Sequence, residues 1–268
     1  MARKRTEGEF VEALARGLHV ICAFSTSHLA LTVSEVAEAT DLARPTARRL
    51  LLTLENLGYV RSKEGVFMLT PKILELGISY INAQGMWDIA QPHLAALVAQ
   101  THESSSMSQL DGSDIVYTAR VPVPKIIGLS VQIGTRFPAV ATSMGQVLLA
   151  DLPIKDLEIA LRTPSQSRVI PRLKPTRKEI DATLEEVRAR GWAMSDERLS
   201  FGIRSVAAPV FDASGHVIAA VNVTVNAAET SVADLKKSYL PLLLKTAEAI
   251  TVDFVQVSSL PTTEPLQP

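Results

Sequence analysis

The stretch from Thr32 to Gly58 constrains the fold more than any other part of this chain, because its pattern is that of two short helices that meet at an angle. Thr32 and Glu35 have the T-x-x-E spacing of a capping box, which predicts that a helix begins at Val33. Pro45 suits the first turn of a second helix, since its missing N–H would have no partner there. Gly58 is expected to end that helix. Its apolar stripe at helical spacing consists of Ala47, Leu50, Leu51, Leu54 and Leu57.

The second helix presents hydrogen-bond donors opposite its leucine stripe. Its N-terminal half carries Arg44, Thr46, Arg48, Arg49 and Thr53. Strands are predicted at 59–61 and 66–69, with a turn at 62–65 that forms a wing. In a helix-turn-helix the start of the second helix enters the major groove, where arginine pairs with guanine edges. The pattern therefore predicts a winged helix-turn-helix that binds double-stranded DNA. The alternative is a small helical subdomain whose arginines are merely solvated.

Eight residues are candidates for contact with DNA. Arg61 and Lys63 belong to the wing, where they are expected on or beside a phosphate backbone. The others lie on the two helices of the motif. The full predicted set is Thr32, Ser34, Arg44, Thr46, Arg48, Arg49, Arg61 and Lys63.

Three segments carry a resemblance to a known family. Residues 43–77 are ARPTARRLLLTLENLGYVRSKEGVFMLTPKILELG, residues 133–150 are IGTRFPAVATSMGQVLLA, and residues 191–225 are GWAMSDERLSFGIRSVAAPVFDASGHVIAAVNVTV. The first resembles the winged helix-turn-helix of the IclR family of bacterial transcriptional regulators, and the other two resemble that family's effector-binding domain. The likeness covers roughly residues 10–255. Together with ARVP at 119–122, these segments are most similar to the branch that controls aromatic-acid and β-ketoadipate pathways.

Length and composition are compatible with such a protein. A chain of 268 residues exceeds one average domain and suggests two, and 47% hydrophobic residues suffice for buried cores. The formal net charge of −1 argues against nucleic-acid binding on its own, but the arginines are concentrated on the motif. The single cysteine, Cys22, is expected in the core of a cytosolic protein. Neither a membrane-spanning run nor a signal segment is present, so the expected location is cytoplasmic.

The expected organisation is a DNA-binding domain at 9–70, a linker helix at 71–85, an effector-binding domain at 86–255 and a disordered tail at 256–268. A first helix is predicted to cover the two-helix motif with the stripe Phe10, Leu14, Leu18 and Ile21. The linker helix carries the stripe Leu74, Ile78 and Ile81, which must bury against another surface.

The second part alternates between strand and helix signals. Strands are predicted at 105–110, 115–121, 192–195, 205–211 and 217–226, and Ile127, Leu129, Val131 and Ile133 alternate with period two. Helices are predicted near 86–100, at 143–150, 154–162 and 176–190, and from about Ser231 onward. Hairpins and helices in this order predict an α+β domain with an antiparallel sheet. The family resemblance implies that it is a GAF-like effector-binding domain.

A ligand pocket is expected where the helix at Ser143 begins, because free amides and the helix dipole favour an anion there. The resemblance to the family's best-known sensor of small acids implies ligand contacts at Ile126, Ser143, Met144, Ser195, Ser205, Asn222 and Thr224. That sensor has an acid at the position of Ser195 and a cysteine at the position of Ser205, so its ligand is not transferred. Local hydrogen bonds within a sheet are the alternative for each residue. Arg120 and Arg204 are possible carboxylate partners or surface ion pairs.

No enzyme chemistry is indicated. The five histidines lack metal-ligand spacing, and neither a G-x-S-x-G elbow nor a Walker loop is present, so no cofactor, metal or catalytic residue is expected. Three hypotheses remain: an effector-responsive transcription factor, a sensor module without sequence-specific DNA binding, and a small-molecule enzyme. The first implies operator DNA, a small carboxylate from aromatic catabolism, a homodimer or tetramer, and RNA polymerase if the protein activates. The effector and the sign of regulation stay open.

Overall fold

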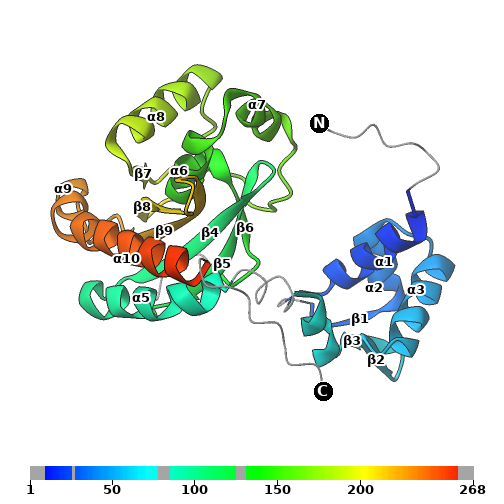
Figure 1. Cartoon of the computed structure of the whole chain (residues 1–268). Coiled ribbons are helices and arrows are strands. Elements are labelled where there is room, and N and C mark those ends of the chain that lie inside the picture. The colour runs from blue at the N-terminus through cyan, green and yellow to red at the C-terminus, as the bar shows by residue number, and fades with distance from the viewer. Residues whose placement is uncertain (1–9, 26–27, 78–84, 125–130, 259–268) are drawn as a thin grey trace. The chain divides into compact units, whose positions relative to one another are not determined.

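The structure, a computed structural model, describes residues 10–25, 28–77, 85–124 and 131–258. These residues form two compact units, coloured blue to cyan and cyan to red in Figure 1, and each unit is described by itself. The first unit contains α1 (Glu12–Ala23), β1 (Ala30–Thr32), α2 (Val33–Thr40), α3 (Arg44–Asn56), β2 (Val60–Lys63), β3 (Val66–Leu69) and the 3₁₀ turn η1 (Pro71–Leu74).

The local signals of the two-helix motif are confirmed. The Thr32 hydroxyl accepts a hydrogen bond from Glu35 N at 3.3 Å, and Thr32 N donates to the Glu35 carboxylate at 2.7 Å. This capping box begins α2 at Val33. Pro45 lies in the first turn of α3, and Gly58 follows that helix with φ +82°. Only glycine adopts this left-handed conformation without strain, which explains why the helix ends there.

The wing is a tight hairpin. β2 and β3 pair antiparallel, and Glu64 and Gly65 both have positive φ, 54° and 82°. Two consecutive positive φ values are typical of the turn that matches the twist of paired strands. Strand β1, which was not predicted, pairs with the other side of β3, so that β2 is an edge of the three-stranded sheet β1-β3-β2.

The core of the first unit differs from the expected one on α1. Three of the four residues of the stripe predicted to cover the motif are exposed: Phe10, Leu14 and Leu18 expose 48%, 63% and 49% of their surface. The fourth, Ile21, packs as predicted against a core formed by α2, α3 and the sheet, and α1 also buries Val20. Cys22 is exposed, so its prediction as a core residue is wrong. On α3 the stripe is buried at Ala47, Leu51 and Leu54 but ends before Leu57, which is exposed.

The predicted linker helix is only partly described. Residues 71–74 form the 3₁₀ turn η1, whose cap is Thr70, and residues 75–77 are helical. Leu74 exposes 67% of its surface. The stripe residues Ile78 and Ile81 lie outside the described residues.

The second unit is an α+β fold. Its strands are β4 (Ser104–Asp111), β5 (Asp114–Val121), β6 (Arg136–Pro138), β7 (Ala193–Asp196), β8 (Ile203–Phe211) and β9 (Val217–Asn226). Its helical elements are α5 (Met86–Thr101), η2 (Ala139–Ala141), α6 (Ser143–Asp151), α7 (Ile154–Arg162), α8 (Arg177–Arg190), α9 (Val232–Asp234), the π turn η3 (Leu235–Tyr239) and α10 (Leu240–Ser258). The strands form one antiparallel sheet in the order β6-β5-β4-β9-β8-β7.

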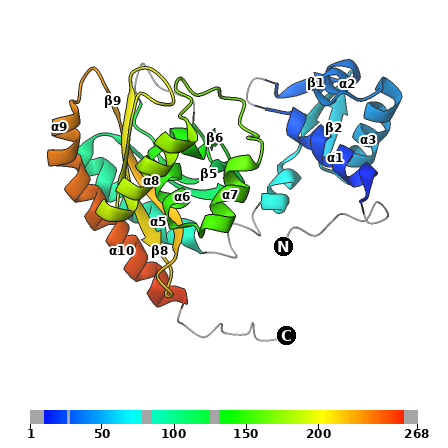
Figure 2. The ribbon, with the colours of Figure 1, turned by 90° about the horizontal axis from the view of Figure 1, so that it is seen from above.

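The sheet separates two layers of helices, as Figure 2 shows. Helices α5 and α10 cover one face, and α6, α7 and α8 cover the other. Along β8, Val206 and Ala208 face α5 and α10, whereas Ala207 faces α6. This alternation follows from the period of two in a strand, and it assigns Ser205 to the α6 face.

Two predictions for this unit need correction. The alternation from Ile127 to Ile133 does not produce a strand in the described part, because Val131 and Ile133 lie in a loop and turn before β6. Ile127 and Leu129 lie outside the described residues. At the other end of the unit, α10 extends to Ser258, so residues 256–258, predicted as tail, are helical.

Candidate functional site

The N-terminal half of α3 presents an exposed basic surface. Arg44, Arg48 and Arg49 are exposed, and Thr46 is half-buried. Within the described residues no carboxylate forms an ion pair with any of these arginines. Their charge is therefore available to an anionic partner.

The remaining candidates for DNA contact fall into two groups. Arg61 and Lys63 are exposed on the wing strand β2, on the face away from the core residue Phe67. Ser34 is exposed in the first turn of α2. The Thr32 hydroxyl is occupied by the capping box, since it also donates to the Glu35 carboxylate at 2.8 Å. The capping box thus explains why a hydroxyl residue is present at position 32 without a contact to DNA.

Two side chains hold the C-terminal half of α3 against its neighbours. The Glu55 carboxylate accepts hydrogen bonds from the Ser62 backbone N–H at 2.8 Å and from the Ser62 hydroxyl at 2.6 Å. Ser62 lies on β2, so Glu55 binds the edge of the wing sheet. Lys72, in the 3₁₀ turn, donates to the carbonyl of Leu57 at 3.1 Å and lies over the Tyr59 ring. The wing and the start of the linker are both attached to α3.

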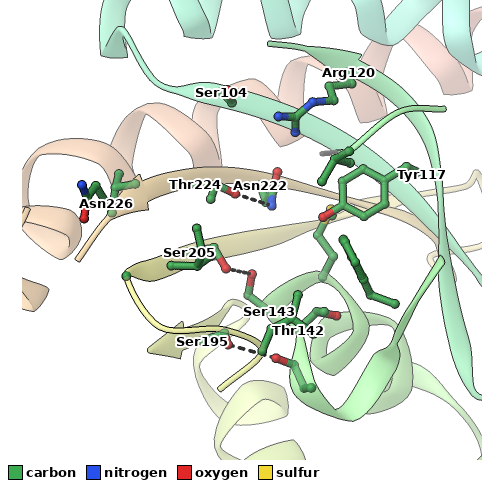
Figure 3. A pocket seen from close by; sticks show the side chains of 18 of the residues that line it. Ser104, Tyr117, Arg120, Thr142, Ser143, Ser195, Ser205, Asn222, Thr224 and Asn226 are labelled. Atoms are coloured by element: carbon green, nitrogen blue, oxygen red, sulfur yellow. Dashed lines mark hydrogen bonds between the residues drawn. The ribbon is translucent and has the colours of Figure 1, made fainter. Parts of the chain in front are cut away.

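A pocket of about 350 Å³ lies in the second unit between the sheet and the N-terminus of α6 (Figure 3). Its size suits a small organic ligand. The walls combine aromatic and aliphatic side chains, including Tyr117 and Phe137, with hydroxyl and amide groups. Six of the seven effector residues expected from the sequence line it, and these are Ser143, Met144, Ser195, Ser205, Asn222 and Thr224. Ile126, the seventh, lies outside the described residues.

The polar residues of the pocket are bonded to one another as well as to the backbone. The hydroxyls of Ser143 and Ser205 are 2.8 Å apart. Asn222 accepts from Ser106 N at 3.0 Å and donates to the Thr224 hydroxyl at 3.0 Å. Ser195 donates to the carbonyl of Ala141 at 3.1 Å. These side chains therefore make the local bonds that the alternative predicts, and they also line one cavity.

The start of α6 is fixed by its cap and by a close backbone contact. Thr142 is the N-cap, and its hydroxyl accepts from Gly145 N at 3.0 Å. Gly145 packs directly on η2: a Cβ at this position would lie 2.2 Å from the carbonyl oxygen of Ala139. Any larger residue must displace backbone, so glycine is required for this packing.

Arg120 and Tyr117 face the pocket because β5 is irregular. Met107 of β4 pairs with Ala119, whereas Ser108 pairs with Tyr117, so Thr118 is an extra residue in β5. In a regular strand, residues three apart point to opposite faces, but this bulge turns Tyr117 and Arg120 to the same face.

Burial raises the pKa of the Tyr117 phenol to about 12. Burial also lowers the pKa of the Arg120 guanidinium.

The two arginines left open by the sequence have different surroundings. Arg204 donates to the Asp196 carboxylate at 2.7 Å and to the carbonyls of Ala227 and Thr230, so its guanidinium is paired. Arg120 donates to the Ser106 hydroxyl at 2.9 Å. Among the described lining residues, Arg120 is the one that carries a formal charge.

Sequence reasoning missed several parts of the pocket. Ser104, Tyr117, Phe137 and Asn226 line it, and none of them was among the expected contacts. The edge-to-face packing of the Tyr117 and Phe137 rings, with centroids 5.6 Å apart, brings together strands β5 and β6. The sequence did not predict that β5 and β6 pair, because its strand pattern before the Ser143 helix lies at 127–133, whereas β6 is Arg136–Pro138.

Comparisons with known proteins agree with this geometry. Residues 13–64 match the family model described as IclR helix-turn-helix domain, and residues 78–252 match the one described as Bacterial transcriptional regulator IclR C-terminal. The chain belongs to the IclR family and is a DNA-binding transcriptional regulator. Its α+β unit, with the antiparallel sheet, is that family's C-terminal domain.

Two curated relatives and one solved structure illustrate the similarity. The chain is 37% identical to the Pca regulon regulatory protein of Pseudomonas putida over 237 residues, which is 88% of this chain and 81% of the relative. It is 34% identical to the p-hydroxybenzoate hydroxylase transcriptional activator of Acinetobacter baylyi, over 92% of each protein. A crystal structure of a protein from Rhodococcus sp. RHA1 is 48% identical, with a TM-score of 0.80 over 92% of this chain and 100% of that one. No helix in the described part of the chain is long and apolar enough to cross a membrane.

Proposed function

We propose that this regulator controls genes of aromatic-acid catabolism and responds to a small carboxylate, an aromatic acid or a product of ring cleavage, bound in the pocket beside α6. The observation that carries the proposal is the cavity of about 350 Å³, in which six expected polar and apolar residues meet aromatic walls and one arginine. The relatives named as regulators of the pca regulon and of p-hydroxybenzoate hydroxylase support the same ligand class.

DNA recognition is assigned to α3 and the wing within segment 9–70. Arg48 and Arg49 read base edges, while Arg61 and Lys63 bind phosphates. Segment 71–85 connects this domain to the effector-binding domain at 86–255. The unpaired charge of the α3 arginines within the described residues supports the assignment.

The active species is proposed to be a homodimer or a pair of dimers. One winged helix reads a short half-site, and two copies held at a fixed spacing multiply discrimination. The exposed apolar side chains of α1, among them Leu14 and Leu18, supply surface for such pairing.

Binding measurements on the full-length protein test the proposal. Calorimetry with benzoates, hydroxybenzoates, muconates and oxoadipate should find an acid that binds, and the same acid should change the affinity for operator DNA selected from random sequences. An acid that binds without affecting DNA affinity favours a sensor module, and turnover of the acid favours an enzyme. Absence of binding across the panel contradicts the proposed ligand class.

A further inference from the structure

Arg120 is a half-buried arginine of the second unit without a negative partner among the described residues, in contrast to Arg136 and Arg204. Arg204 is paired with Asp196, and Arg136 is paired with Asp111 and Asp114. Among the described residues, Arg120 has one hydrogen-bond partner, the neutral Ser106 hydroxyl, and its buried Nε has none. Within the described residues no carboxylate lies at ion-pair distance from it.

A guanidinium in this position is costly to the ligand-free protein. Burial lowers the pKa of Arg120, yet an arginine stays protonated at neutral pH. A charge that leaves water without a counter-charge loses solvation energy that one neutral hydrogen bond does not restore. An apolar or amide side chain would fill the same place at lower cost. The residue is therefore explained best by an anion that is sometimes present beside it.

The pocket is where that anion has access to the guanidinium. The β5 bulge turns Arg120 to the α6 side of the sheet, and Figure 3 shows its guanidinium projecting over Asn222 and Thr224. In that view the bonded pair Ser143 and Ser205 lies on the other side of Asn222. Charge is thus at one end of the cavity and neutral hydroxyls are at the other.

We propose that Arg120 binds the carboxylate of the effector in the pocket, and that the effector's opposite end contacts the Ser143 and Ser205 hydroxyls. This inference rests on the proposed function, which makes the ligand a small carboxylate. It reverses the orientation expected from the sequence, which directs the carboxylate to the start of α6.

The start of α6 is the weaker anion site for a structural reason. Its capping residue Thr142 already accepts from Gly145 N through its hydroxyl and from Gln146 N through its carbonyl. The Ser143 hydroxyl is bonded to Ser205. Two hydroxyls in contact keep one proton to donate and lone pairs to accept, which suits a neutral polar group such as a hydroxyl. A full negative charge is better matched by the guanidinium, which binds a carboxylate with two parallel hydrogen bonds.

The experiment compares charged and neutral ligands of the same shape in variants of the full-length protein. Calorimetry uses benzoate and 4-hydroxybenzoate beside benzamide and 4-hydroxybenzamide. In the wild type we expect the better acid to bind at least about tenfold more tightly than its amide. Arg120→Met should weaken acid binding about 10- to 100-fold and change amide binding little, and Arg120→Lys should restore part of the preference for acid.

The melting temperature of the ligand-free protein is a second readout. Replacing an arginine that only stabilises the fold would lower this temperature, whereas replacing an arginine kept for ligand binding should raise it. Because Arg120→Met removes an uncompensated charge, it should raise the melting temperature of the ligand-free protein by about 2–4 °C. The matched control is Arg204→Met, which leaves Asp196 unpaired and should lower the melting temperature. In folded Arg204→Met protein the preference for acid over amide should remain.

The outcomes separate this inference from the proposal on which it rests. Acid binding that survives Arg120→Met at wild-type strength overturns the assignment of Arg120 and leaves the ligand class intact. Equal binding of acid and amide by the wild type also overturns the assignment of Arg120. A lower melting temperature for Arg120→Met shows that the arginine is structural and also overturns the assignment. If the wild type binds no acid from this set or from the wider panel, the proposed function fails and this inference fails with it.

Discussion

Glu55 is a negative charge beside a surface assigned to DNA, and its effect on binding can be worked out from two hydrogen bonds. Its carboxylate accepts from the backbone N–H and the hydroxyl of Ser62, at 2.8 and 2.6 Å. Ser62 lies on the edge strand β2 between Arg61 and Lys63. Glu55 therefore holds the strand that carries both basic side chains of the wing.

The expected cost of Glu55→Ala follows from these bonds. Each is worth about 0.5–1.5 kcal/mol net, and Glu55 is half-exposed, so both together contribute about 1–2 kcal/mol to wing position. If this cost appears in binding, operator affinity falls about 5- to 30-fold for each protomer. Loss of the phosphate contacts of Arg61 and Lys63 in a dimer would also flatten the log–log salt dependence by about 3–4 units.

Glu55→Gln separates position from charge. Glutamine keeps an oxygen that accepts from Ser62, and it removes a negative charge that repels DNA. We therefore expect Glu55→Gln to bind operator at least as tightly as the wild type, while Glu55→Ala binds more weakly. Fluorescence anisotropy with labelled operator at several salt concentrations measures both effects. The reasoning is refuted if Glu55→Ala matches the wild type in affinity and salt slope, or if Glu55→Gln falls as far as Glu55→Ala.

Three other predictions concern the DNA helix, the pocket wall and assembly. Arg48→Ala and Arg49→Ala should each weaken operator binding by about 1–3 kcal/mol. The control Arg162→Ala on α7 should leave operator affinity unchanged. An Arg48→Ala, Arg49→Ala double mutant that binds operator at wild-type strength contradicts the assignment of α3. Gly145→Ala should destabilise the second unit by about 1–3 kcal/mol or more in urea unfolding, because the added methyl group would overlap backbone. Gly17→Ala is the control and should not destabilise the protein, because nothing lies within 4 Å of a Cβ at that position. Sedimentation at micromolar concentration should show at least a dimer, and a monomer that protects a single half-site would refute this.

Local signals in the sequence predicted local structure well. The capping box at Thr32 and Glu35, the proline at the start of α3 and the glycine after it involve groups a few residues apart, so their spacing determines their contacts. The face of α1 was predicted wrongly at three of its four stripe residues, because that helix has apolar residues on more than one side. Spacing shows that Leu14 and Val20 are apolar, but it does not show which of them another element covers.

The pocket required information that spacing does not carry. Polar residues in apolar strands, such as Asn222 and Thr224, marked one face of the sheet, and the family resemblance selected them. The sequence gives no sign of the bulge at Thr118, which depends on how β5 pairs with β4. Without it, Tyr117 and Arg120 would be expected on opposite faces. The pairing of Arg204 with Asp196 likewise appears only when β7 and β8 lie side by side.

The coupling between the two sites is tested most directly by measuring acid affinity in the presence and absence of operator. Since an effector changes operator affinity only through a difference in its binding to two states, the operator must change acid affinity by the same factor. Calorimetric titration of the full-length protein with its best acid, repeated with saturating operator DNA, provides that factor. We expect a change of about 5- to 150-fold, equal to the shift that the acid produces in operator affinity. Equal acid affinities with and without operator would contradict an effector-responsive regulator.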